Sequence, residues 1–171
     1  MSGPRRFEAG QQALLPAVLD RAEEVVGDRF HVASFRDSQY AYDVRTRDDL
    51  GPDEVPAGSA LATIVRYGRD REPRKLSRFH RICLHDGRIL ACAEDEDLPL
   101  QAVLLVVLVH ELIHLVRFTV PHTTFHVPAT QRRDEEAEVD RLTAELLGDY
   151  PEPDVRRAAR LVTGLAPLPS S

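Results

Sequence analysis

The chain has 171 residues, of which 43% are hydrophobic and 29% charged, and this length and composition are ordinary for one soluble domain with a hydrophobic core. The formal net charge of -6 argues against a dedicated nucleic-acid binder. We therefore predict a single domain over residues 1–171, without a nucleic-acid partner and with an oligomeric state that the composition leaves open.

The N-terminal part, residues 1–97, is predicted to hold a helix and a sheet. It starts without the apolar core of a secretory signal, so we expect a cytoplasmic protein. Apolar residues recur at helical spacing over 11–26, and Pro16 near the start indicates that the regular helix begins there. Strands are predicted from β-prone or alternating residues at 30–35, 40–44 and 60–67.

A β-hairpin is predicted at the end of this part. Residues 78–84 and 88–93 flank an Asp-Gly pair, which is a typical two-residue hairpin turn. In such a hairpin Cys83 and Cys92 would lie diagonally, farther apart than a relaxed disulfide allows. We therefore expect two reduced thiols in the core.

The C-terminal part, residues 98–171, is predicted to be helical. Residues 98–118 are apolar on nearly all sides, which predicts a central, buried helix. This segment is long enough to span a bilayer, but it carries two histidines and a glutamate that no second apolar segment could shield, so we expect no membrane partner. Helices are also predicted at 134–147 and 154–164, after a loop at 119–133. The fold class is therefore α+β, with a small, mostly antiparallel sheet packed on the buried helix.

The most specific motif in the chain is His110-Glu111-Leu112-Ile113-His114, an HExxH sequence inside the apolar run. On a helix the two histidines stand one turn apart, so both imidazoles can bind one metal ion. Glu111 would face the open side of such an ion, where a carboxylate can take a proton from a bound water molecule. Burying these groups costs on the order of several kcal/mol unless a partner such as a cation compensates them.

A catalytic zinc ion needs a third protein ligand, and Glu136 is the preferred candidate. It lies near the start of a predicted helix, and Asp140 one turn later can accept the second N–H of a ligating histidine. Glu135 is the alternative, although its one-turn neighbour, Val139, offers no such acceptor.

Other polar residues after the motif could assist catalysis. The extended HExxHxxGxxH pattern fails, because Arg117 and Val120 occupy its Gly and third His positions. His122, His126 and Tyr150 therefore remain candidates for the proton donor or oxyanion stabiliser rather than for ligands.

His110-Glu111-x-x-His114 followed by Glu136-x-x-x-Asp140 resembles the gluzincin arrangement of thermolysin-like peptidases. The residues from Glu136 to Leu147, which end in Ala-Glu-Leu-Leu, are similar to the third-ligand helix of the small ImmA/IrrE-like zinc peptidases and minigluzincins, with Val-Asp in place of Ala-Asn. The resemblance covers about residues 110–147. It implies a zincin-like fold, zinc ligands at His110, His114 and Glu136, and Glu111 as the general base.

The resemblance also implies that an edge strand beside the HExxH helix binds an extended peptide, and residues 88–93 are the expected strand. We therefore predict a zinc metallopeptidase, a hydrolase in which Glu111 activates zinc-bound water, with Zn2+ as cofactor and a peptide or protein as substrate. The alternative is a non-catalytic, zinc-binding regulatory or interaction domain that keeps the peptidase fold. A peptide deformylase would need a Cys ligand, and neither Cys83 nor Cys92 has the required sequence setting.

Overall fold

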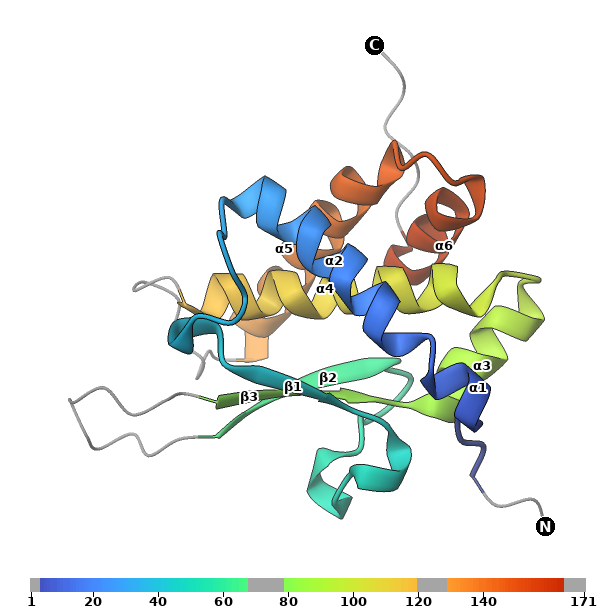
Figure 1. Cartoon of the computed structure of the whole chain (residues 1–171). Helices are drawn as coiled ribbons and strands as arrows, with labels where there is room; N and C mark the ends of the chain where they lie inside the picture. Colours follow the sequence, from blue (N-terminus) through green and yellow to red (C-terminus); the bar gives the residue numbers. More distant parts are fainter. Residues whose placement is uncertain (1–3, 68–78, 120–128, 165–171) are drawn as a thin grey trace.

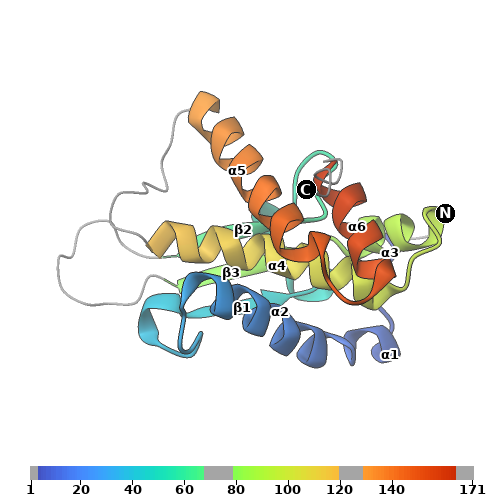
Figure 2. The same ribbon diagram turned by 90° about the horizontal axis from the view of Figure 1, so that it is seen from above.

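The computed structural model describes residues 4–67, 79–119 and 129–164, and their arrangement is α+β (Figure 1). A three-stranded sheet forms one layer, and the long helix α4 (Leu100–Thr119) lies on one face of it. Seen from above, α4 runs between α2 on one side and α5 and α6 on the other (Figure 2). The HExxH helix is therefore enclosed by the sheet and by helices on both flanks.

Helix α4 is the core of the molecule. Every residue from 102 to 116 is buried, which accounts for the almost continuous apolar sequence, because each side of this helix meets a neighbour. Among the described residues it is the one helix that is long and apolar enough to cross a membrane, and most of that stretch is buried inside the fold. The prediction of a central, buried helix at 98–118 is confirmed to within two residues.

The N-terminal helices confirm one expectation and correct another. After the short α1 (Ala9–Gln12), α2 extends over Leu15–Phe30 with Pro16 in its first turn, where its missing N–H costs no helical hydrogen bond. The strand expected at 30–35 is wrong, because Phe30 ends the helix and His31 adopts a left-handed conformation with φ of 57°. That conformation reverses the chain and prevents an extended segment there.

The sheet has the strand order β1-β3-β2, with β1 at Tyr42–Arg45, β2 at Ala62–Tyr67 and β3 at Phe79–Leu84. β3 is antiparallel to β2 and parallel to β1. The sheet is thus mixed rather than mostly antiparallel, because β3 is inserted between two strands of opposite direction and must run parallel to one of them. Between β1 and β2 the chain forms irregular structure with two short 3-10 turns, Arg47–Asp49 and Pro52–Glu54.

The predicted β-hairpin is wrong, because the residues after β3 form helix α3 (Asp86–Asp95). The buried apolar residues of this helix, Ile89, Leu90 and Ala93, share one helical face. The burial of that face outweighs the preference of Asp-Gly for a turn. The Asp86 carboxylate is buried and accepts hydrogen bonds from the main-chain N–H groups of Phe7 and Arg47 at 2.9 and 3.0 Å.

Both cysteines are free thiols, as expected, although the hairpin on which that expectation rested does not exist. Cys83 is buried in β3 and Cys92 is on α3. Burial raises the pKa of the Cys83 thiol to about 12, so this thiol is neutral and unreactive at physiological pH.

The last two helices are α5 (Ala129–Gly148) and α6 (Pro153–Thr163). α5 begins five residues before the predicted helix at 134–147, so residues 129–133 of the predicted loop are helical, whereas α6 matches its predicted range closely. Val139, Leu142 and Leu147 of α5 are buried against the core. Helix α5 thereby contacts α4, on the side away from α2 (Figure 2).

Candidate metal centre

The HExxH residues of α4 are all buried. His110, Glu111 and His114 are 8%, 5% and 7% exposed, and the two imidazole rings lie one turn apart with their centroids separated by 4.9 Å. Three polar groups in two consecutive turns of a core helix require compensation of their lost hydration. Their compensation comes from the neighbouring helix.

Glu136 on α5 bridges the two histidines. Its Oε1 lies 2.8 Å from Nε2 of His110, and its Oε2 lies 3.0 Å from Nε2 of His114. The Glu136 side chain is 55% exposed, so the cluster is closed on the side of the core and open on the side of solvent. The structure thus brings together the two histidines and the glutamate that the sequence selected as candidate ligands.

The donor atoms fit a small divalent cation. One donor atom from each of the three residues lies within 4.8 Å of the others, so one ion between them can contact all three. Two imidazole nitrogens and one carboxylate oxygen form the His2Glu donor set of catalytic zinc sites, in which a further position stays open. The exposure of Glu136 leaves this cluster open to solvent.

The three residues polarise one another electrostatically. Burial alone would lower the pKa of His110, but its hydrogen bond with Glu136 and the surrounding carboxylates raise it. Partial burial would raise the pKa of Glu136, but its hydrogen bonds with His110 and His114 hold it well below the usual range. The negative charge of Glu136 and the positive charge that an imidazole can carry thus favour each other at this cluster.

Asp140 lies one turn after Glu136 on α5 and faces the other nitrogen of His110. Its Oδ1 is 3.3 Å from Nδ1 of His110, within ion-pair distance but without the alignment of a hydrogen bond. Burial raises the pKa of the Asp140 carboxyl. A small rotation of either side chain would convert this contact into the hydrogen bond that commonly orients a ligating histidine.

The alternative third ligand, Glu135, is engaged elsewhere. Its two carboxylate oxygens accept hydrogen bonds from Nε and Nη2 of Arg117 on α4, at 2.6 and 2.9 Å. Glu135 does not belong to the cluster of candidate ligands. The choice of Glu136 over Glu135 therefore agrees with the positions of the two side chains.

A cleft of about 700 Å3 opens beside the cluster. One wall comes from β2 and the chain before it, and the other from α4 and α5. The lining residues are Ala57, Ser59, Ala60, Ala62, Thr63, Ile64, Glu111, His114, Phe118, Arg132, Glu135 and Glu136. Arg132 and the β2 residues were not anticipated from the sequence; Arg132 precedes Glu136 by four residues, and this helical spacing is the signal that could have identified it.

Glu111 lies where the cleft meets the cluster. Burial raises the pKa of its carboxyl, and the nearby histidines counteract this only in part. A carboxyl group in this state accepts a proton more readily than a solvated one. The residue after the first histidine of the motif is thus both accessible from the cleft and chemically suited to proton transfer.

The strand beside the cleft is β2, which is an edge strand of the described sheet. Leu61 directly precedes β2 and His85 directly follows β3, and the main-chain N–H of His85 donates to the carbonyl of Leu61 at 2.8 Å, so these two residues continue the β2–β3 ladder as a hydrogen-bonded pair. Hydrogen-bonded and non-hydrogen-bonded pairs alternate along an antiparallel ladder. The main-chain groups of Ala62 and Ile64 therefore point away from β3, toward the open edge. The expectation that residues 88–93 form the edge strand is wrong, because they belong to α3.

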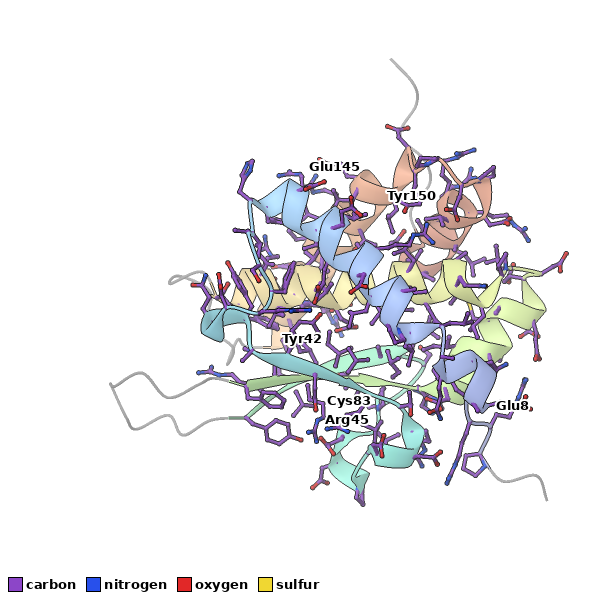
Figure 3. All side chains as sticks on the ribbon, viewed as in Figure 1. Glu8, Tyr42, Arg45, Cys83, Glu145 and Tyr150 are labelled. Carbon is purple, nitrogen blue, oxygen red and sulfur yellow. The ribbon has the colours of Figure 1, made fainter. Side chains whose placement is uncertain are left out.

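Tyr150, His122 and His126 were the candidates for the proton donor or oxyanion stabiliser. Tyr150 lies after the end of α5, beside α6 (Figure 3), and its hydroxyl accepts a hydrogen bond from Arg21 at 2.8 Å. It does not line the cleft, so a role as oxyanion stabiliser has no support. His122 and His126 lie outside the described residues.

Comparisons with protein-family models, curated proteins and solved structures give no match for this chain. A functional conclusion therefore depends on the chemistry of the site itself.

Proposed function

We propose that this protein is a zinc-dependent peptidase of the gluzincin type, with His110, His114 and Glu136 as metal ligands and Glu111 as general base. The observation that carries the proposal is the Glu136 carboxylate, which joins both imidazoles of the motif beside a cleft that Glu111 also lines. A purely structural zinc site is normally closed by four protein ligands and has no use for a carboxylate at an open position.

A zinc ion at this site would supply Lewis acidity, which lowers the pKa of water and polarises a peptide carbonyl. Glu111 accepts the proton of the attacking water as the new C–O bond forms. It then donates that proton to the amide nitrogen as the C–N bond breaks. The raised pKa of the Glu111 carboxyl suits both steps, because the group must hold the proton between them.

The cleft favours an extended peptide as the substrate. The outward main-chain groups of Ala62 and Ile64 can pair with a peptide strand laid along β2. Small side chains at Ala57, Ser59 and Ala60 leave room beside that strand. The main chain of a peptide bound in this way would lie next to Glu111 and His114.

The experiment that tests the proposal is digestion of a diverse peptide library by zinc-loaded protein, with the products identified by mass spectrometry. We expect cleavage by the wild-type protein and none by Glu111→Gln, with about one zinc ion bound per chain in both, as a three-ligand catalytic site requires. Wild-type protein that binds no zinc would refute the metal centre. Zinc binding without cleavage of any library peptide would instead favour the non-catalytic zinc domain.

A further inference from the structure

The part of α5 that carries Glu136 is attached to the protein without apolar anchors. From Arg132 to Glu138 no side chain of this helix is buried, and the first buried residue after Arg132 is Val139. Hydrophobic burial therefore holds α5 in place from Val139 onward, but not over residues 132–138. The position of residues 132–138 therefore depends on polar contacts with α4.

One such contact lies directly beside the candidate ligands. Arg117 follows His114 by three residues on α4, and Glu135 immediately precedes Glu136 on α5. Their side chains form a two-point contact, Nε to Oε1 at 2.6 Å and Nη2 to Oε2 at 2.9 Å, and they are only 29% and 16% exposed. Paired hydrogen bonds between a guanidinium and a carboxylate fix both distance and orientation, and partial burial limits their screening.

We propose that Arg117 is a positioning residue, which holds Glu135 and thereby sets the neighbouring Glu136 at the height of the two imidazoles. This inference rests on the proposed metal centre. A metal site requires its ligands within about 0.5 Å of the productive geometry, and a fraying helix turn cannot supply that. The Arg117–Glu135 pair supplies the constraint that apolar packing does not give in this part of α5.

A second role for the pair would be contact with substrate, because Glu135 also lines the cleft. The two roles differ in what they control. A substrate contact affects KM and leaves the metal-free protein unchanged, whereas a positioning contact changes metal affinity and the local stability of α5 before any substrate binds.

The test compares Arg117→Ala and Glu135→Gln with Arg141→Ala. Arg141 is the matched control, because it makes a similar two-point contact with Glu138 on the same helix, at 2.9 and 2.8 Å, but on an exposed surface. We expect zinc binding, measured by competition with a chelator, to weaken about 10- to 100-fold in Arg117→Ala, as for other residues that orient ligands. Arg141→Ala should bind zinc like the wild-type protein. The double variant Arg117→Glu with Glu135→Arg should recover part of the loss.

Amide hydrogen exchange of the metal-free proteins provides a readout independent of zinc and of peptidase activity. The amides around Glu136 should exchange faster in Arg117→Ala and Glu135→Gln than in Arg141→Ala, while those after Val139 remain protected. Glu135→Gln retains one acceptor oxygen for Arg117, and it replaces Arg117→Ala in the test if that variant does not fold. Equal zinc affinity in Arg117→Ala and the control, or equal exchange around Glu136, would overturn the positioning role. A wild-type protein without zinc affinity would refute the metal centre, and the exchange experiment would still decide whether the pair holds α5.

Discussion

Nδ1 of His110 lies 3.3 Å from Oδ1 of Asp140, on the opposite side of the imidazole from Glu136. A single turn of α5 therefore presents one carboxylate to each nitrogen of the same histidine. A histidine that binds a metal through Nε2 needs its proton on Nδ1, and a carboxylate beside Nδ1 favours that tautomer. Under the proposed function, the Glu-x-x-x-Asp spacing would supply one ligand and also place a carboxylate where it can orient another.

Replacement of Asp140 tests this arrangement. Asp140→Ala should weaken zinc binding about 10- to 100-fold, because the imidazole of His110 loses the group that fixes its tautomer and orientation. Asp140→Asn, which keeps an acceptor oxygen, should lose less. Competition with a chelator measures both, and the control is Glu138→Gln on the same helix, outside the cluster of candidate ligands. Unchanged affinity in Asp140→Ala would mean that His110 needs no help from α5 beyond Glu136.

Glu111→Gln separates catalysis from metal binding. The substitution preserves shape but removes the proton acceptor, so kcat should fall about 100- to 10,000-fold, the usual contribution of a general base. Zinc content should stay at the wild-type level, since Glu111 is outside the cluster of candidate ligands. Steady-state kinetics with metal analysis on the same sample checks both. Loss of zinc in this variant would assign Glu111 a place among the ligands.

Zinc should stabilise the folded protein. At a free zinc concentration about 100 times Kd, binding adds about 2.7 kcal/mol to the free energy of unfolding, which corresponds to about 5–10 °C in Tm for a chain of this size. Thermal unfolding with zinc and with excess chelator measures the difference. Glu136→Gln should show a much smaller zinc-dependent shift, and an equal shift in that variant would place the ion elsewhere.

The correct and incorrect sequence predictions have a common physical reason. The one-turn spacing of His110 and His114, and that of Glu136 and Asp140, follows from helical periodicity, which depends only on nearby residues, and so it was predictable. The contact between the two pairs is a tertiary one, and it was expected only because a zinc site needs a third ligand. The structure at Asp86-Gly87 was not predictable in this way, because its turn preference competes with a buried helical face whose core partners are distant in sequence. The cleft beside Ile64 also depends on how β2 is placed next to α4, which no local pattern encodes.

Glu54, in the 3-10 turn that contacts β2 and β3, should make folding stability sensitive to acid. Glu54 accepts hydrogen bonds from the Tyr67 hydroxyl, from the Gly51 N–H at 2.9 Å and from Arg81 at 3.1 Å. These contacts, that of Tyr67 above all, lower the pKa of Glu54 from 4.5 to about 2. The contribution of the ionised carboxylate to stability is therefore complete above pH 4.5 and is lost as the pH falls toward about 2.

Glu54→Gln should accordingly have a lower Tm than the wild-type protein at neutral pH, because an amide cannot replace the charge that Arg81 and Tyr67 contact. The gap should narrow as the pH falls from 4.5 toward about 2, where the wild-type carboxylate also becomes neutral. Thermal unfolding at several pH values measures this, with Asp53→Asn, an exposed neighbour in the same 3-10 turn, as the control. A gap that stays constant across that range would show that Glu54 acts through shape and not through its charge.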